Sequence, residues 1–301
     1  MISLHTKEAF AYYESVRHRL PQASFTHSTQ TLHTLEEMVE VADGFLLDAF
    51  GVLNVGDKAI PKAIWLITTL RKRGKRFCIL SNSATSSKMA LLNFFHSLGF
   101  DFAPHEIITS REVLWHTLPL DRFEQWGVIA PSIATLEKEF LTVDIHHETF
   151  LHSDAFLFLG SHTWNDALHV KLKMALKERP RPMWIGNPDI TAPRGNAHYS
   201  LEPGYYTLLE EETLFQNFHF VGKPFKEVFL YAIDKAWNEW QIPKERLVMV
   251  GDTLHTDILG ATSVGLQTLL VEDYGFFAEE NVEPYIAQSH IIPHFRLSRY
   301  D

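Results

Sequence analysis

Short apolar runs that end at a polar residue recur along the chain and predict buried strands. The first, GFLLDAFGVL, places three apolar residues directly before Asp48 and a glycine at position 51. A run of this length without alternation is typical of a strand buried on both faces of a sheet. Similar runs lead to Ser81 and Asp252, and segments with helical periodicity follow them. This order of strands and helices predicts an α/β fold with a Rossmann-like core built on a parallel sheet.

Between residues 123 and 202 the pattern changes to shorter strand candidates that alternate with helices of their own. We expect this segment to form a second, smaller α/β unit inserted into the first. The first 35 residues carry apolar side chains at helical spacing and should pack on the main unit as an extension. The predicted units are therefore a helical extension at 1–35, a core at 36–122 and 203–301, and an insert at 123–202.

The composition is that of an ordinary globular protein and restricts the classes of partner. The chain has 301 residues, of which 46% are hydrophobic, and a formal net charge of -10. Binding of a nucleic-acid duplex requires clustered lysine and arginine, so this charge argues against a nucleic-acid partner. The sequence has no apolar stretch of membrane-helix length, no signal-peptide core and a single cysteine, Cys78. We expect no membrane partner and a cytoplasmic location.

Side chains capable of catalysis stand at the ends of predicted strands or near predicted helix starts. The carboxyl ends of parallel strands meet at one edge of a sheet, where ligands bind in open α/β folds. A carboxylate nucleophile, a hydroxyl, an ammonium group and two acids around one hard cation suit phosphoryl transfer through an aspartyl-phosphate. Ser81 could equally be a helix N-cap. The candidate residues are Asp48, Ser81, Lys223, Asp252 and Asp257.

The order and spacing of these residues resemble the haloacid dehalogenase superfamily over roughly residues 40–275. The Asn-Pro-Asp sequence at 187–189 and the Gly-Lys-Pro sequence at 222–224 make the chain similar to the class IIA, NagD-like branch. In that branch a C2-type cap domain is inserted between the second and third motifs. The resemblance implies a hydrolase whose cap selects a small phosphorylated metabolite, and caps of this type contribute to homodimers in the family.

The resemblance also implies a role for each catalytic residue. Asp48 would be the nucleophile, and Lys223 would position it and balance its charge. Ser81 and the backbone at Asn82 would hold the transferring phosphate. Further substrate contacts would come from the loop after the last strand of the cap, with Asn187 and Asp189 as the candidates.

The cofactor implied by the resemblance is Mg²⁺. It would be bound by the carboxylates of Asp48 and Asp252 and by the backbone carbonyl of Phe50. Asp257 would either ligate the ion or orient its waters. The ion would link the nucleophile to a phosphate oxygen and neutralise the repulsion between the acids.

Phe50 departs from the pattern of the family. Phosphatases of this superfamily carry D-x-D in the first motif, and the second acid protonates the leaving group and later activates water. A phenyl ring cannot transfer a proton, and general acid–base catalysis typically contributes about 10² to 10⁴ in rate. We therefore expect hydrolysis that is weak, that is selective for good leaving groups, or that recruits its acid from the cap or the substrate.

Two other functions remain open from the sequence. The sequence D-A-F-G at position 48 resembles the D-A-Y-G of haloacid dehalogenases, which displace halide without a metal, although GDTLHTD keeps the metal-binding acids. A catalytically impaired regulatory protein that binds a phosphorylated ligand would also keep the site and lack the acid. The three functions differ in turnover, in halide release and in their dependence on Mg²⁺.

Overall fold

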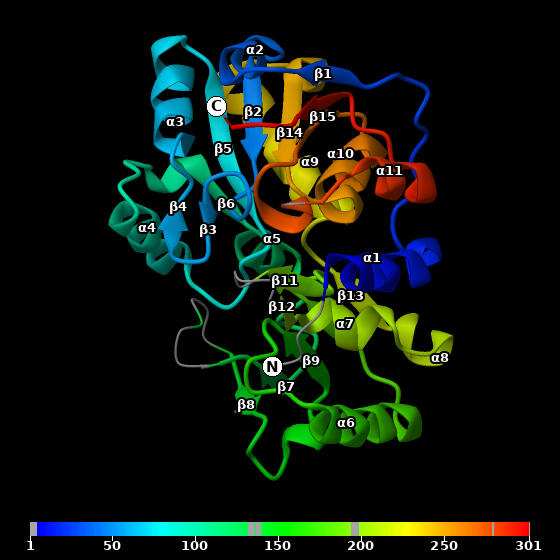
Figure 1. The fold of residues 1–301 in the computed structure, drawn as a ribbon. Coiled ribbons are helices and arrows are strands. Elements are labelled where there is room, and N and C mark those ends of the chain that lie inside the picture. The colour runs from blue at the N-terminus through cyan, green and yellow to red at the C-terminus, as the bar shows by residue number, and fades with distance from the viewer. Residues whose placement is uncertain (1–4, 132–135, 137–139, 194–198, 279, 301) are drawn as a thin grey trace.

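Two sheets of parallel strands form the framework of the molecule, and one lies above the other in Figure 1. The computed structural model describes residues 5–131, 136, 140–193, 199–278 and 280–300. The larger sheet has seven strands, all parallel, and confirms the predicted Rossmann-like core. In spatial order they are β1 (Gln30–Leu32), β16 (Phe295–Leu297), β15 (Gln267–Val271), β14 (Leu247–Gly251), β2 (Gly44–Leu47), β5 (Arg76–Ser81) and β6 (Ile107–Thr109).

Strand β2 is an interior strand of this sheet, and all four of its residues are buried. Phe45 and Leu47 belong to one hydrophobic cluster, and Leu46 belongs to another on the opposite face. Such two-sided burial explains the continuous apolar run in the sequence. Cys78 on the neighbouring strand is likewise fully buried, and burial raises its pKa to about 12, as expected of a core residue.

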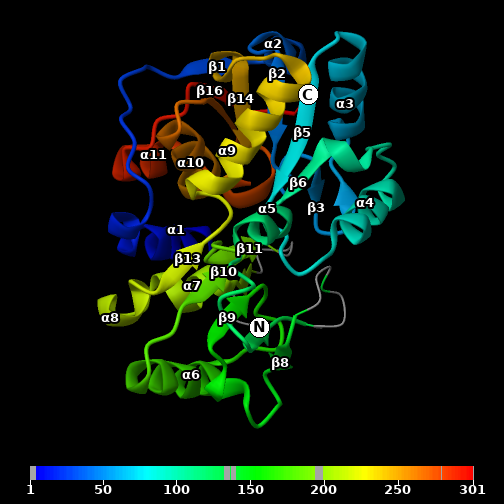
Figure 2. The ribbon, with the colours of Figure 1, turned by 180° about the vertical axis from the view of Figure 1, so that it is seen from behind.

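Helices cover both faces of the seven-stranded sheet. One face packs against helices from the first third of the chain, and the other packs mainly against later helices, with α9 in front in Figure 2. The first group comprises α2 (Leu35–Glu40), α3 (Ala63–Lys72) and α4 (Lys88–Ser97). The second comprises α5 (Ser110–Thr117), α9 (Lys226–Lys235) and α10 (Leu259–Ser263), and α11 (Glu283–Ser289) lies near the end of the chain.

The second sheet has five parallel strands and confirms the smaller inserted α/β unit. Its last strand along the chain lies well beyond residue 202, where the sequence placed the return to the core. The pattern of the insert also predicts a helix near 132–140, and that segment falls almost entirely outside the described residues. In spatial order the strands are β13 (Phe218–Phe220), β10 (Met183–Ile185), β9 (Ala155–Phe158), β7 (Trp126–Ile129) and β8 (Thr142–Asp144), with helices α6 (Asp166–Glu178), α7 (Pro203–Leu208) and α8 (Glu212–Phe215).

The sequence also predicts a helix near 203–213 where the chain returns to the core, but this segment forms two short helices within the second unit. The backbone N–H of residue 202 pairs with the loop after β10, so this segment stays beside the second sheet. The chain reaches the core only after β13, which pairs with β10. The boundary at 203 was therefore placed too early, because edge strand β13 is too short to be recognised from its pattern.

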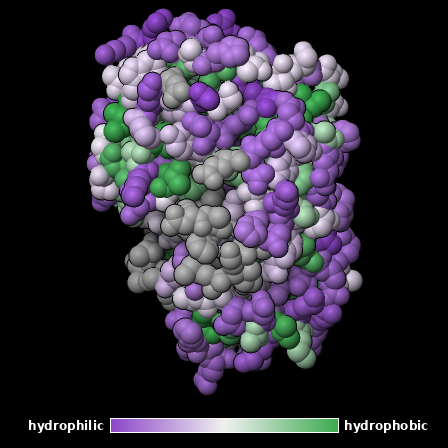
Figure 3. Space-filling model, viewed as in Figure 1, coloured by the Kyte–Doolittle hydropathy of each residue, from purple (hydrophilic) through white to green (hydrophobic). Residues whose placement is uncertain are grey.

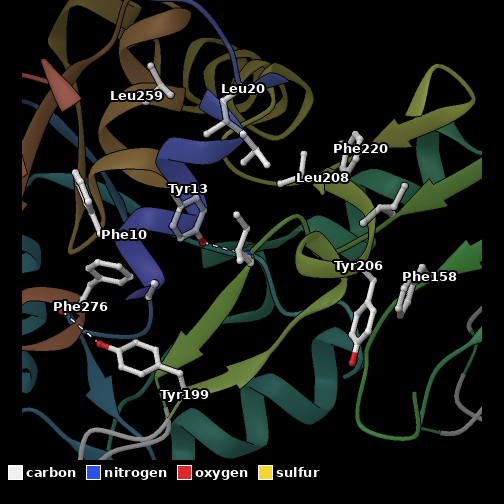
Figure 4. Close-up of a cluster of buried hydrophobic side chains, with 14 of the residues drawn as sticks. Phe10, Tyr13, Leu20, Phe158, Tyr199, Tyr206, Leu208, Phe220, Leu259 and Phe276 are labelled. Atoms are coloured by element: carbon white, nitrogen blue, oxygen red, sulfur yellow. Dashed lines mark hydrogen bonds between the residues drawn. The ribbon is translucent and has the colours of Figure 1, made fainter. Parts of the chain in front are cut away.

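The N-terminal segment does more than pack on the core. Helix α1 (Thr6–Ser15) is followed by a 3₁₀ turn at Arg17–Arg19, and β1 then joins the edge of the seven-stranded sheet beside β16. In Figure 1, α1 lies between the two sheets, and Figure 4 shows its side chains packed against both units. The segment is thus an integral part of the fold.

The remaining elements are hairpins and single turns. The hairpins are β3 (Asn54–Val55) with β4 (Lys58–Ala59), and β11 (Thr191–Pro193) with β12 (Tyr199–Leu201). Two π-helical turns, Ala236–Trp240 and Leu254–Ile258, adjoin α9 and α10. Short 3₁₀ turns occur at Pro104–Glu106, Phe150–His152, Lys244–Arg246 and Gly275–Phe277.

The surface is mainly hydrophilic on the face drawn in Figure 3, with hydrophobic residues in small separate groups. The exposed large hydrophobic side chains of the described residues are spread over several helices, including Trp65 on α3, Met174 on α6 and Trp237 after α9. Homodimer formation therefore stays a prediction. The helices within the described ranges all fall short of the length and apolar character that a membrane crossing requires.

Candidate active site

Adjacent strand ends bring three of the predicted residues together. In the sheet, β2 lies between β14 and β5, with Leu47 paired to both Val250 and Ile79. The backbone N–H of Asp48 continues the ladder by donating to the carbonyl of Val250 at 2.8 Å. Asp48 therefore leaves the sheet between the ends of the two strands that lead to Ser81 and Asp252.

Three carboxylates form a compact cluster at this edge. One oxygen each of Asp48, Asp252 and Asp257 lies within 4.8 Å of the others. Asp257 reaches the cluster because the π-helical turn after β14 carries it back toward the strand end. There its Oδ2 accepts a hydrogen bond from the backbone N–H of Thr253 at 3.2 Å. The two acids of GDTLHTD thus lie within one cluster.

Lys223 is a buried cation between two of these acids. Its Nζ lies 2.7 Å from Oδ1 of Asp48 and 2.6 Å from Oδ1 of Asp257, and only 3% of its side chain is exposed. Burial by itself would lower the pKa of Lys223, but the two carboxylates raise it above its ordinary value. Lys223 is therefore charged, and the alternative of a solvated surface lysine is wrong.

Asp252 sits in a tight backbone pocket. Its Oδ2 accepts from the N–H of Phe276 at 2.7 Å, and its Oδ1 accepts from the Thr253 hydroxyl at 3.0 Å. A Cβ on Gly51 would lie 2.5 Å from Oδ2, so the backbone after Phe50 passes directly against this carboxylate. Burial, together with the charges of Asp48 and Asp257, raises the pKa of Asp252 well above its ordinary value.

The donor set suits a hard divalent cation. Three carboxylates against the single Lys223 ammonium leave two formal negative charges at one buried point. Carboxylate and backbone carbonyl oxygens are the ligands that Mg²⁺ prefers, and a divalent ion would relieve the repulsion that raises the pKa of Asp252. The position of Gly51 against Asp252 places the neighbouring Phe50 backbone beside the same cluster.

Ser81 faces the cavity and does not cap a helix. Its Oγ accepts a hydrogen bond from the N–H of Ser83 at 3.2 Å. Helix α4 begins at Lys88, and its N-cap is Ser87, whose hydroxyl accepts from Ala90 N–H at 3.2 Å. The N-cap alternative for Ser81 is therefore wrong, because a loop separates the strand end from the helix. The residues of that loop, 82–86, line the cavity instead.

Asn82 connects the core to the Asn-Pro-Asp loop. Its Oδ1 accepts from the N–H of Lys223 at 2.7 Å, and its Nδ2 donates to the carbonyl of Lys223 at 2.9 Å. The same Nδ2 donates to Oδ1 of Asp189 at 2.9 Å. Asn187 in turn accepts from the N–H of Asp189 and donates to Glu202. All of these side chains border the cavity, so the predicted loop does reach the site.

A cavity of about 340 Å³ joins these residues between the two sheets. Its walls include several residues that the sequence did not single out, namely Tyr13, His162, Thr191, Glu202, Thr253, Thr256 and Phe276. Tyr13 comes from α1, where its spacing indicated only a core position. Helical periodicity reports that a residue is buried but not what covers it, so no local signal could have placed Tyr13 here.

Comparison with protein families gives two separate matches along the chain. Residues 45–144 match the family of haloacid dehalogenase-like hydrolases, and residues 220–297 match a HAD-hydrolase-like family. The first match extends over β7 and β8 of the second sheet, and the interval between the matches contains β9 and β10. The chain belongs to the haloacid dehalogenase superfamily of hydrolases, as its motifs indicated.

Individual relatives agree with this placement. The chain is 26% identical over 284 residues to the human glycerol-3-phosphate phosphatase, and the match covers 84% of this chain and 87% of the relative. A solved structure described as a possible sugar phosphatase from Cytophaga hutchinsonii superposes with a TM-score of 0.78 at 24% identity, covering 90% of this chain and 98% of that one. NagD from Escherichia coli has the same fold, with a TM-score of 0.63 at 23% identity over 85% of this chain and 96% of that one.

Proposed function

We propose that this protein is a Mg²⁺-dependent phosphatase that acts on a small phosphorylated metabolite through an aspartyl-phosphate on Asp48. The observation that carries the proposal is the buried Lys223, held between Asp48 and Asp257 in a cluster that also contains Asp252. The human relative is named as a phosphatase of glycerol-3-phosphate, a small phosphate ester of this class. A cavity of about 340 Å³ with polar walls suits a substrate of that size.

In the first step, the attack of Asp48 on phosphorus, separate residues would orient the nucleophile and hold the phosphate. Lys223 and the N–H of Ala49 both bind Oδ1 of Asp48, which fixes the carboxylate and leaves Oδ2 for attack on phosphorus. The hydroxyl of Ser81 and the backbone at Asn82 face the same cavity and would hold the phosphate oxygens. Holding nucleophile and phosphate in line removes much of the entropic barrier to their reaction.

The cation would be held by Asp48, Asp252 and the backbone carbonyl of Phe50, with Asp257 as a ligand or as an anchor for bound water. When bound, Mg²⁺ supplies charge neutralisation between the phosphate and the acids. The proposal agrees with one structural neighbour, which is described as a glycerol phosphate phosphatase from Mycobacterium tuberculosis in complex with magnesium. That neighbour shares the fold at 18% identity and a TM-score of 0.63.

The test is hydrolysis of p-nitrophenyl phosphate, whose leaving group departs without protonation. We expect turnover by the wild type in Mg²⁺ and none in excess chelator. Asp48→Asn should lower the rate by at least about 10³, because an amide cannot act as the nucleophile. Asp234→Asn on α9, an exposed residue that does not line the cavity, is the matched control and should retain the wild-type rate.

Each alternative function has its own outcome in the same assay series. Tight binding of a phosphate ester without turnover, unchanged in Asp48→Asn, would support a regulatory binding protein. Release of halide from a 2-haloacid that persists in chelator would support a dehalogenase. Either result, with folded protein, would replace the phosphatase proposal.

A further inference from the structure

The active-site cavity lacks an acid at position 50, but other proton-bearing groups line it. A phenyl ring occupies the place from which a leaving group would be protonated, and an alkoxide without a proton leaves slowly. Apart from the residues of the carboxylate cluster and Lys223, the titratable side chains that line the cavity in the described part of the chain are Tyr13, His162, Asp189 and Glu202. These four groups differ in their burial and in the hydrogen bonds that they make.

Three of these groups are poorly suited to deliver a proton. The hydroxyl of Tyr13 accepts a hydrogen bond from the N–H of Ile190, and burial raises its pKa well above the ordinary value, which makes it a weaker acid. Glu202 is buried and accepts hydrogen bonds from Asn187 and Ser200. His162 is exposed, and no described residue holds its ring by a hydrogen bond.

Asp189 is held in place with one oxygen still available. Its Oδ1 accepts from Nδ2 of Asn82 at 2.9 Å, and its backbone N–H donates to Asn187 at 3.1 Å. Within the described ranges Oδ2 receives no hydrogen bond, while the residue lines the same cavity as Asp48. Because Asn82 is itself fixed by two hydrogen bonds to the backbone of Lys223, Asp189 is linked through Asn82 to the segment that carries the catalytic lysine.

The position of Asp189 suits a group that acts on the leaving oxygen. Asp48 extends from the first sheet, whereas Asp189 follows β10 of the second sheet. In an in-line displacement the nucleophile and the leaving group lie on opposite sides of phosphorus. A leaving oxygen directed away from Asp48 would therefore point toward the loops of the second sheet, where Asp189 lies.

The surroundings of Asp189 favour its protonated, neutral form. Burial raises its pKa to about 8, and the charges of Asp48 and Glu202 act in the same direction. Lys223 and the hydrogen bond from Asn82 oppose this rise without cancelling it. A carboxylic acid in such surroundings is neutral before the reaction and can act as a donor.

We propose that Asp189 is the general acid–base residue of this enzyme and takes the role that Phe50 cannot perform. The inference rests on the proposed phosphatase function. Asp48 attacks phosphorus, the bond from phosphorus to the ester oxygen breaks, and the proton of Asp189 passes to that oxygen to give the alcohol. The Asp189 carboxylate then takes a proton from water, the resulting oxygen attacks phosphorus, the bond to Asp48 breaks, and inorganic phosphate leaves.

The decisive variant is Asp189→Asn. An amide oxygen can still accept the hydrogen bond from Asn82, so the loop keeps its anchor while the proton is lost. For glycerol 3-phosphate, an alkyl ester, we expect kcat/KM to fall by about 10² to 10⁴. For p-nitrophenyl phosphate, kcat/KM should change less than about threefold, because nitrophenolate departs without help from an acid.

The second half of the reaction gives an independent readout. Without a base to activate water, the aspartyl-phosphate should persist in Asp189→Asn. We expect a burst of about one equivalent of nitrophenolate followed by a slow steady rate. An acid restored at the first motif, in the double variant Phe50→Asp with Asp189→Asn, should recover most of the lost kcat/KM on glycerol 3-phosphate.

The outcomes separate the inference from the function on which it rests. If the wild type does not hydrolyse p-nitrophenyl phosphate at all, the proposed phosphatase and the role of Asp189 both fail. If the wild type does so, but Asp189→Asn matches it on glycerol 3-phosphate, Asp189 is not the acid. Equal losses on both esters without rescue by Phe50→Asp would make Asp189 a structural link between the two units and would also overturn the inference. Asp234→Asn serves again as the control.

Discussion

At the scale of single residues, the site depends on how closely backbone and carboxylate approach each other. Gly51 has φ of +74°, a conformation that glycine adopts freely, and it passes against Asp252. Gly275 also lies directly against the same carboxylate, next to Phe276, whose N–H donates to it. The orientation of Asp252 is thus determined by two glycines as well as by its own hydrogen bonds.

Gly51→Ala should therefore damage the proposed metal site. A Cβ would meet Oδ2 of Asp252 at 2.5 Å, so the carboxylate has to move. We expect the Mg²⁺ concentration for half-maximal hydrolysis of p-nitrophenyl phosphate to rise by about 10-fold or more. Gly56→Ala is the matched control, since Gly56 also has a positive φ, +58°, but no atom lies within 4 Å of its added Cβ.

Comparing Gly51→Ala with Gly56→Ala cancels the cost of backbone strain, because each alanine at positive φ costs about 1 kcal/mol. Equal Mg²⁺ requirements in the two variants would show that Asp252 adapts to the added methyl group and that its position is not critical.

At the scale of elements, α6 is attached to the α7–α8 segment by ion pairs to Glu210 and Glu211, of which Glu210 is the buried one. The side chain of Glu210 is 8% exposed, with His169 Nε2 2.9 Å from its Oε1 and Lys173 Nζ 2.8 Å from its Oε2. Burial alone would raise the pKa of Glu210, but hydrogen bonds from His169 and Lys173 lower it to about 2. These contacts hold the helices of the second sheet together.

The lowered pKa of Glu210 predicts a defined loss of stability in acid. Because the folded-state pKa lies below the ordinary value of 4.5, the ionised group contributes its full stabilisation above about pH 4.5. This contribution is lost as the pH falls toward 2. Glu210→Gln should lower the free energy of unfolding at pH 7 by about 1–3 kcal/mol, and the difference from the wild type should shrink at about pH 3.

Urea unfolding at both pH values measures this difference. Glu212→Gln is the control, because that carboxylate is 76% exposed and its pair with Arg19 should contribute little. If Glu210→Gln lowers the free energy of unfolding by the same amount in acid as at neutral pH, the lost contacts are not electrostatic.

At the scale of the whole molecule, α1 joins the two units through one continuous hydrophobic cluster. Phe10 and Tyr13 on α1 belong to the same buried cluster as Phe158 of the second sheet and Leu259 of the core (Figure 4). Polar contacts follow the same path, since Arg19, just after α1, donates to the backbone carbonyl of Leu208 in the second unit.

Phe10→Ala should destabilise the molecule more than its place in a terminal helix suggests. The side chain is 2% exposed and packs edge-on against the rings of His255 and Tyr285. Truncation of a buried phenylalanine leaves a cavity, and we expect a loss of about 3–5 kcal/mol in the free energy of unfolding. Urea denaturation followed by circular dichroism measures this loss.

Lys7→Ala on the exposed side of α1 is the control and should change the stability by less than about 0.5 kcal/mol. If Phe10→Ala were as stable as Lys7→Ala, α1 would be a dispensable covering and would not couple the two units.

The strands of the core could be predicted from the sequence because their burial is two-sided. An uninterrupted apolar run followed by an acid or a hydroxyl is a local pattern, and β2, β5, β14 and β15 lie where such runs occur. The common edge of parallel strands then brought Asp48, Ser81 and Asp252 together, as the topology required. By contrast, the three-residue strands β1, β13 and β16 carry too few residues to show a period.

By itself, the sequence determined the parallel core, the inserted unit and the identity of the groups at the strand ends, because these follow from local apolar patterns and from chain order. Only the tertiary structure decided what surrounds those groups. The decisive contacts join residues far apart in the chain. Lys223 is buried between two acids, Asn82 contacts Asp189, and Tyr13 forms part of the cavity wall. Such contacts depend on how the two sheets and α1 pack together, and packing across long sequence separations leaves no periodic signal along the chain.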